Sequence, residues 1–260
     1  MQFGCSTLLY GGYDLKTALD GIKTAGYDAI ELSSIPGMGE HFKGGAAPSV
    51  YEEIKGQLAA SGLALESVGC SGALGTERFE PLMVAAAALG APYMTVGTGG
   101  TSDDEEAWAQ ALATVRAALP VCERTGVKLS VKPHVRAAVH NTVTARRFLD
   151  ELQSPWVGLN LDNTHLQRAG ADPVQAVREL QDHVFTARIR DFLSDDLGIG
   201  QVENQIPGKG QADVRGYLQA LTLVPKLQVV VVEMVGVKDF PLSEVQRMVG
   251  ETLTALRSYQ

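Results

Sequence analysis

Charged and polar side chains stand at or near the ends of short apolar segments along this chain. Nine of them, spread over six segments, can transfer protons or hold an anion: Glu31, Glu66, Lys132, His134, Asp162, His165, Arg188, Asp191 and Glu233. Carboxylates and histidines are common general acids and bases, and Lys and Arg supply positive charge for an oxyanion. Any one of them alone could form a structural salt bridge. Nine strand-end residues together predict a genuine site.

The apolar segments alternate with amphipathic stretches, and the two must be arranged so that the segment ends meet. We predict strands at residues 3–7, 29–33, 64–69, 93–97, 128–132, 157–162, 184–191 and 227–235. We predict helices at residues 15–25, 49–61, 81–89, 103–125, 142–152, 172–180, 214–223 and 242–258. The last strand is apolar almost throughout, as expected for a strand covered on both faces. Eight such units predict one α/β domain over residues 1–260, a single (β/α)8 TIM barrel, with a doubly wound open sheet as the alternative.

Turn signals agree with this reading. Gly26, Gly62, Gly90 and Gly126 each follow a predicted helix, where glycine relieves a left-handed cap. Ser102 precedes three acidic residues, which predicts a helix start. We interpret the GTGG at 97–100 as a helix-capping turn rather than a phosphate loop. Two long irregular segments, 34–48 and 192–212, follow strands and predict functional loops at the mouth of the barrel.

Composition excludes several classes of protein. The 22 Lys and Arg residues are outnumbered by 30 Asp and Glu residues, and the formal charge of −8 argues against a nucleic-acid partner. Three scattered cysteines form neither a disulfide framework nor a thiolate zinc site. Without a signal-like start or a run of about 18 apolar residues, we expect a cytoplasmic protein that does not span a membrane.

The chain resembles the xylose isomerase-like TIM barrels, a family of sugar phosphate isomerases and epimerases, over essentially its whole length. The matching segments are AGYDAIELSS with Glu31, GVKLSVKPH with Lys132 and His134, VGLNLDNTHL with Asp162 and His165, ARIRDF with Arg188 and Asp191, GKGQAD at 208–213, and VVVEM with Glu233. The resemblance implies carbohydrate metabolism and one divalent ion, Mn or Mg. Its ligands are a Glu, an Asp, a His and a Glu ending the fifth to eighth strands.

Two of the four implied ligands are replaced in this sequence. Lys132 stands where the family has Glu, and Arg188 where it has His, while Asp162 and Glu233 remain. Charged Lys and Arg side chains have no lone pair for a metal, so we expect no bound metal or other cofactor. The alternative is an ordinary Mn- or Mg-dependent isomerase whose ligands are shifted by two residues to Asp162, Glu233 and His134, since that shift keeps the same strand face.

Our first hypothesis, which leans toward an enzyme, is an isomerase or epimerase acting on a carbonyl-bearing sugar or polyol derivative without a metal. Lys132 and Arg188 would replace the metal as electrophile, and Glu233 would be the base. The two cations also suit a sugar acid or sugar phosphate. A Schiff base on Lys132 is a further alternative. The candidate substrate-binding residues are His165, Asp162, His134, Glu66 and His41.

Our second hypothesis is a non-catalytic sugar- or anion-binding or regulatory barrel. In it, the salt bridges Lys132–Asp162 and Arg188–Glu233 would plug the site. A DNA-repair enzyme of the same superfamily is disfavoured, because those enzymes carry His-rich zinc sites and this chain has five His. Asp191 would either orient the two cations or cap the following loop. The expected partner is a small molecule, and a homo-oligomer is compatible with the sequence.

Overall fold

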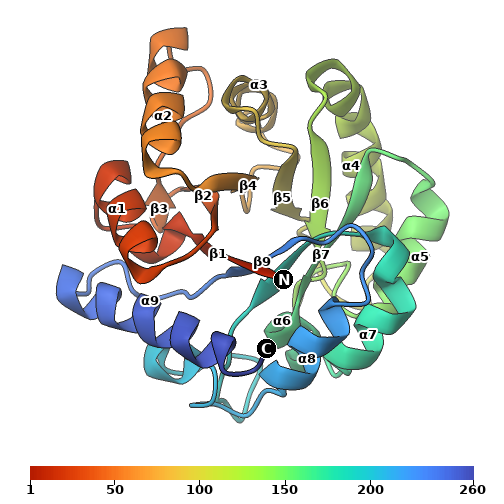
Figure 1. Ribbon diagram of the computed structural model, residues 1–260. Coiled ribbons are helices and arrows are strands. Elements are labelled where there is room, and N and C mark those ends of the chain that lie inside the picture. Colours follow the sequence, from red (N-terminus) through yellow and green to blue (C-terminus); the bar gives the residue numbers. More distant parts are fainter.

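Eight short strands pair into one closed parallel sheet in the computed structural model, which describes residues 1–260 (Figure 1). The strands are β1 (Gln2–Ser6), β2 (Ala29–Ile35), β4 (Ala64–Gly69), β5 (Tyr93–Gly97), β6 (Lys128–Lys132), β7 (Val157–Asp162), β8 (Val184–Ile189) and β9 (Val229–Val232). Each pairs in parallel with the next, and β1 pairs with both β2 and β9, which closes the sheet. The predicted (β/α)8 barrel is therefore confirmed.

Amphipathic helices surround the barrel and bury their apolar faces against it (Figure 1). They are α1 (Leu15–Ala25), α2 (Pro48–Ser61), α3 (Phe79–Leu89), α4 (Glu105–Thr125), α5 (Thr142–Leu152), α7 (Pro173–Leu180), α8 (Val214–Leu221) and α9 (Leu242–Arg257). All four glycines predicted to follow helices adopt the left-handed C-cap conformation. The sequence pattern did not predict the short elements β3 (Gly39–Glu40), α6 (Asn163–Arg168), η1 (Thr7–Tyr10), η2 (Gln181–His183) and η3 (Val202–Gln205).

Several predicted boundaries were wrong. β8 ends at Ile189 instead of 191, because the N–H of Asp191 bonds to the carbonyl of Gln205 in the following loop. The helix predicted from residue 103 begins at Glu105, because the Asp104 side chain caps it and Asp103 has a φ of 60°. The GTGG segment is not a helix cap: it turns after β5, and the carbonyl of Gly99 accepts from Ala138 in the loop after β6.

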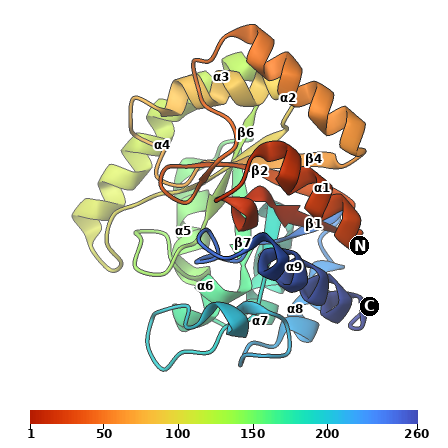
Figure 2. The ribbon, with the colours of Figure 1, turned by 90° about the vertical axis from the view of Figure 1, so that its left-hand side faces the viewer.

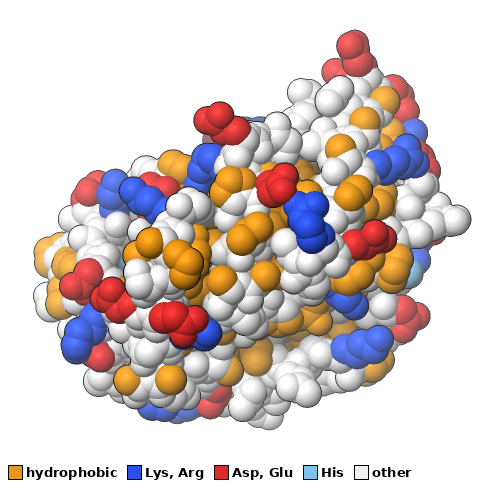
Figure 3. Space-filling model, turned by 90° about the horizontal axis from the view of Figure 1, so that it is seen from above, with side chains coloured by type: hydrophobic (Ala, Val, Ile, Leu, Met, Phe, Trp, Pro, Cys, Tyr) orange, Lys and Arg blue, Asp and Glu red, His pale blue; other side chains and the backbone are white.

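The two chain ends meet at the N-terminal end of the barrel (Figure 2). The side-chain amide of Gln260 donates to the carbonyl of Met1 at 2.8 Å. On the face seen in Figure 3, apolar side chains are interspersed with charges of both signs. None of the helices is long and apolar enough to cross a membrane. The loops that follow the strands lie at the opposite end from the termini, because all eight barrel strands run in parallel.

One carboxylate organises the longest of these loops, residues 192–212. Oδ1 of Asp191 accepts from the backbone N–H of Phe192 at 2.8 Å and of Ala212 at 2.9 Å. Oδ2 accepts from Gly208 at 2.9 Å and Gly210 at 3.0 Å. A Cβ at Gly210 would lie 2.3 Å from Oδ1, so only glycine fits this approach. The contacts match the second of the two roles considered for Asp191, that of capping the loop.

Candidate active site

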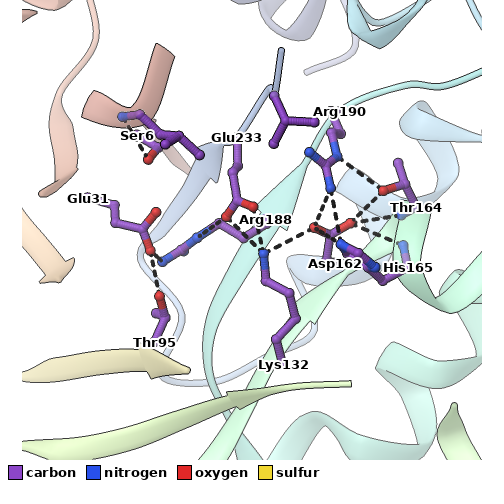
Figure 4. A network of polar contacts seen from close by, with 12 residues as sticks. Ser6, Glu31, Thr95, Lys132, Asp162, Thr164, His165, Arg188, Arg190 and Glu233 are labelled. Atoms are coloured by element: carbon purple, nitrogen blue, oxygen red, sulfur yellow. Dashed lines mark hydrogen bonds and ion pairs between the residues drawn. The ribbon is translucent and has the colours of Figure 1, made fainter. Parts of the chain in front are cut away.

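An ion pair between Lys132 and Glu233 stands at the mouth of the barrel (Figure 4). Lys132 is the last residue of β6, and Glu233 directly follows β9. The ammonium nitrogen lies 2.8 Å from each carboxylate oxygen of Glu233 and 3.4 Å from Oδ2 of Asp162, which ends β7. The side chain of Glu233 is 13% exposed and that of Lys132 is 8% exposed. Both groups therefore reach the edge of the buried interior.

The second cation, Arg188, is fully buried and spans the inside of the barrel. Its guanidinium pairs with Glu31, donates to Ser67 at 2.9 Å, and lies 3.4 Å from Glu66 and 3.6 Å from Glu233. Burial by itself raises the pKa of Glu31, but the charges of Arg188 and Lys132 and the hydrogen bonds from Thr95 and Arg188 together outweigh burial, so the pKa lies below its usual value. For Glu66, burial dominates and the pKa is raised. Arg188 thus holds carboxylates from three strands or their ends together.

The two oxygens of Asp162 have separate tasks. Oδ1 caps α6, accepting from the N–H of Thr164 at 3.0 Å and of His165 at 3.3 Å. Oδ2 faces Lys132 at 3.4 Å and Arg190 at 3.3 Å. Burial opposes ionisation of Asp162, but the charges of Arg190 and Lys132 and the hydrogen bond from Thr164 together outweigh burial, so the pKa is well below its usual range. The capped first turn of α6 is what turns His165 toward the mouth.

His165 lies between two guanidinium groups. Its Nε2 is 3.2 Å from Nη2 of Arg190, and its Nδ1 is 3.1 Å from Nη2 of Arg168. The ring of His134 packs against it, with the ring centroids 3.9 Å apart. Burial lowers the pKa of His165 well below its ordinary value, and Arg190 and Lys132 lower it further, although Asp162 acts in the opposite direction. The imidazole is therefore neutral at pH 7.

The sequence analysis missed both guanidinium groups that flank His165. A signal for each was present in the pattern. Arg190 stands two residues after Arg188, and two-residue spacing along a strand keeps a side chain on the same face. Arg168 stands three residues after His165, which makes the two neighbours once a helix forms. Neither could be placed without knowing that α6 begins directly after β7.

A cavity of about 330 Å³ opens above the Lys132–Glu233 pair. That volume falls within the usual range for small-molecule sites. Polar and apolar side chains both line it, including Lys132, His134, Arg136, His165, Arg168, Arg190 and Glu233 with Leu8, Ile35, Met38, Leu197, Ile199 and Val235. A second cavity of about 240 Å³ reaches Lys132 and His134 from the turn at 97–99. The site is an open pocket of mixed character.

The structure brings most of the predicted residues together. Lys132, Glu233, His134 and His165 line the larger cavity. Behind this layer lie the buried Asp162, Arg188, Glu66 and Glu31, which line neither cavity.

His41 does not reach the cavities. Its Nδ1 is 3.0 Å from the Thr7 hydroxyl and its Nε2 is 3.1 Å from the Tyr13 carbonyl. Both predicted salt bridges are present, Lys132–Asp162 at 3.4 Å and Arg188–Glu233 at 3.6 Å, but each cation lies closer to another carboxylate, Lys132 to Glu233 and Arg188 to Glu31. These contacts depend on how far each side chain reaches across the barrel, and the order of the strands alone does not determine that.

The donor set at this mouth does not fit a divalent metal ion. No group of three or more His, Cys, Asp or Glu side chains is arranged to hold one. The ammonium of Lys132 stands between the carboxylates of Asp162 and Glu233, and Arg188 lies against Glu233 from behind. The shifted ligand set of Asp162, Glu233 and His134 is not assembled. An ion there would face positive charge and too few lone pairs.

The closed parallel sheet makes this chain a (β/α)8 barrel. Its polar pocket lies at the carboxyl ends of the strands, where enzymes of this fold have their active sites. More narrowly, the chain belongs to the xylose isomerase-like TIM barrel family, whose family model matches residues 19–258. No curated protein is significantly similar to it in sequence.

Solved structures share the fold at low sequence identity. The IOLI protein with a bound zinc atom has a TM-score of 0.80 at 18% identity, covering 100% of this chain and 99% of that chain. A 3-keto-D-glucoside 4-epimerase from E. coli has a TM-score of 0.75 at 18% identity, covering 98% and 99%. D-Psicose 3-epimerase with D-tagatose, from Clostridium cellulolyticum H10, has a TM-score of 0.78 at 15% identity, covering 99% of each chain. Sugar epimerases are thus among the structural neighbours.

Proposed function

We propose that this chain is an isomerase or epimerase of a carbonyl-bearing sugar or polyol derivative, and that it works without the divalent metal common in its family. Lys132 is the electrophile and Glu233 the general base. The observation that carries the proposal is the position of their ion pair, because both side chains line a cavity of ligand size. The sugar epimerases among the structural neighbours support the substrate class.

The pair has the chemistry that proton transfer next to a carbonyl requires. Glu233 takes the proton from the carbon beside the carbonyl, and the bonding electrons move to the carbonyl oxygen. The ammonium of Lys132 stabilises the resulting negative oxygen, as a preorganised charge in a dry site does. Each carboxylate oxygen of Glu233 uses one lone pair toward Lys132 and keeps another for the substrate. Delivery of a solvent proton to the opposite face of that carbon completes epimerisation. Protonation of the former carbonyl carbon, with transfer of the hydroxyl proton to the other oxygen, completes isomerisation.

From the sequence, Arg188 was expected to act as an electrophile together with Lys132, and in this proposal it has a different role. It is fully buried and contacts Glu233 from behind at 3.6 Å, so it is a positioning residue. Together with Glu31 it fixes the carboxylate that faces Lys132. The amine of Lys132 donates to two carboxylates, so we propose ammonium chemistry and expect no borohydride-trapped adduct with carbonyl substrates.

Solvent deuterium exchange tests the proposal. EDTA-treated protein is incubated in D₂O with a panel of ketoses, aldoses, sugar acids and sugar phosphates, and exchange beside the carbonyl is followed by NMR. We expect exchange with at least one compound, and a loss of about 100-fold or more in Glu233→Gln, the range typical for removing a general base. Exchange that requires added Mn²⁺, or that persists in Glu233→Gln, would overturn the proposal.

The non-catalytic reading also has an observation in its favour. The inner half of the site is closed by ion pairs, since Arg188 is surrounded by Glu31, Glu66 and Glu233. In that reading the outer cavity binds a sugar or an anion without turning it over. Tight binding of a panel compound with no exchange would favour this function over the enzymatic one.

A further inference from the structure

We infer that the cavity contains an oxyanion subsite built from Arg168 and Arg190, with Arg136 at its rim, and that the ligand carries a carboxylate or phosphate group. The inference deepens the proposed function and rests on it only in assigning the cavity to the substrate. The subsite lies beside the Lys132–Glu233 pair and uses residues that the proposed reaction leaves free.

Arg190 offers a buried donor with no partner. Its side chain is 2% exposed; Nε donates to the Thr164 hydroxyl at 3.1 Å, and Nη2 faces Asp162 and His165. Nη1 has no hydrogen-bond partner. Figure 4 shows this nitrogen on the side of the guanidinium that faces Glu233, away from Thr164. A buried guanidinium N–H without an acceptor is unfavourable, and an anion in the adjoining cavity would satisfy it.

The imidazole of His165 cannot satisfy both guanidinium groups beside it. A neutral imidazole has one lone pair, on one nitrogen, while the other nitrogen carries hydrogen. Arg190 faces one ring nitrogen and Arg168 the other, at 3.2 and 3.1 Å. One of these contacts therefore places two N–H donors against each other. An oxyanion between the guanidinium groups would accept from the donor that the ring cannot.

The charges around the cavity are mostly positive, which also favours an anionic ligand. Its lining has four cations, Lys132, Arg136, Arg168 and Arg190, and one carboxylate, Glu233. Glu233 pairs with Lys132, and the underlying Asp162 pairs with Arg190. No carboxylate lies within 4 Å of the other two cations.

Arg168 and Arg136 are held at the cavity in spite of this imbalance. Arg168 donates to the carbonyl of Leu197, in the loop that covers the cavity. Burial and the charge of Arg190 lower the pKa of Arg168 to about 10, which leaves it charged at pH 7. Arg136 has a φ of 72°, an uncommon conformation for a residue other than glycine. Two positive charges thus face the cavity without an acidic partner.

The spacing defines the size of the ligand. One oxygen of Asp162 lies 3.4 Å from Nζ of Lys132 and 3.3 Å from Nη2 of Arg190, so these nitrogens are at most about 7 Å apart, the sum of the two distances. A carboxylate held by Arg190 and a carbonyl oxygen held by Lys132 would be separated by roughly one to three carbon atoms at about 1.5 Å per bond. Apolar lining residues, among them Leu8, Ile35 and Val235, would contact the carbon skeleton.

Matched pairs of sugars test the subsite by calorimetry. D-Fructuronate is compared with D-fructose, and D-erythrose 4-phosphate with D-erythrose, so that the two arms distinguish a carboxylate from a phosphate; in both anions three carbon atoms separate the anionic group from the carbonyl. We expect one anionic member to bind at least about 10-fold more tightly than its neutral partner. Arg168→Gln should weaken that binding by about 10- to 100-fold, as for loss of a charge-assisted hydrogen bond. Arg178→Gln on α7 removes the same charge from an exposed position and should leave Kd unchanged.

The possible outcomes separate this inference from the proposed function. Equal binding of anionic and neutral sugars, no binding of either anion, or an unchanged Kd in Arg168→Gln would overturn the subsite. Circular dichroism and the melting temperature check that Arg168→Gln is folded. Arg168→Lys keeps the positive charge, is measured beside it, and should recover part of the affinity. Deuterium exchange with neutral sugars alone would keep the function and reject the subsite. Anion binding without deuterium exchange would keep the subsite and reject the proposed isomerase or epimerase function.

Discussion

At the scale of single residues, Asp162 and His165 explain how this mouth holds so much charge. Asp162 uses one oxygen to cap α6 and the other to face Lys132 and Arg190. His165 stays neutral between two guanidinium groups because burial and the charges of Arg190 and Lys132 disfavour its protonated form. The site therefore depends on which side chains are ionised.

We predict that His165 makes the protein less stable as the pH falls below about 6.5. The unfolded chain binds a proton near that pH, while the folded chain does not, because the pKa of His165 is lowered well below its ordinary value. The free energy of unfolding then falls by up to about 1.4 kcal/mol for each pH unit. In His165→Gln this slope should be smaller by that amount between pH 5.5 and 4.5, measured by urea unfolding.

The matched control is Gln167→Leu, a change on the same helix that adds no titrating group and should leave the slope at its wild-type value. Identical slopes in His165→Gln and the wild type would show that His165 is protonated in the folded protein as well.

At the scale of elements, the loop 192–212 is held by the carboxylate of Asp191, the residue just before it. Asp191 accepts four backbone N–H groups, one from each of Phe192, Gly208, Gly210 and Ala212. Leu197, Gly198 and Ile199 of the same loop line the larger cavity. The GKGQAD segment therefore matters for the site because it anchors the far end of a cavity wall, even though none of its residues lines the cavity.

We predict that Asp191→Asn loosens this loop. The amide would turn an N–H donor toward backbone N–H groups, with a loss of about 3 kcal/mol in the free energy of unfolding, the upper range for one hydrogen bond to a charged group. Hydrogen exchange of the amides at 208, 210 and 212 should become at least about 10-fold faster.

Asp196→Asn gives the comparison for this loop. Asp196 also accepts from a backbone N–H, that of Gly198, but on the exposed part of the same loop. Its variant should change the free energy of unfolding much less than Asp191→Asn does, because water solvates the exposed groups. Equal effects of the two variants would mean that Asp191 does not anchor the loop.

At the scale of the whole molecule, Arg188 ties the barrel together from inside. It stands on β8 and reaches Glu31 of β2, Glu66 of β4 and Glu233 after β9. Arg247 on the surface also has three carboxylate partners, Glu203, Glu244 and Glu251. The two clusters have the same composition and differ in burial, which allows a direct comparison.

We predict that Arg188→Met lowers the free energy of unfolding by about 3–5 kcal/mol, because it leaves buried carboxylates without a cation. Arg247→Met should lower it much less, because water solvates the carboxylates that remain. Urea unfolding at pH 7 measures both. The double variant Glu31→Gln with Arg188→Met should recover part of the loss, and no difference between the two arginine variants would contradict the assignment.

The sequence by itself determined the barrel and the end of the barrel at which its polar residues gather. Eight apolar segments alternate with amphipathic ones, and this alternation reflects local burial and backbone hydrogen bonding, which depend on residues near one another in the chain. The strand-end positions of Lys132, Asp162, Arg188 and Glu233 followed from the same pattern, whereas the replacement of two metal ligands was implied by the resemblance to the family.

Only the tertiary structure decided which charges meet. Lys132 pairs with Glu233 and Arg188 with Glu31, and a spacing of a few ångströms across the barrel determines that choice. The same holds for Arg168 and Arg190, which reach His165 only because Asp162 caps a six-residue helix directly after its strand. Ion pairing falls steeply with distance and depends on burial. Neither quantity can be read from spacing along the chain.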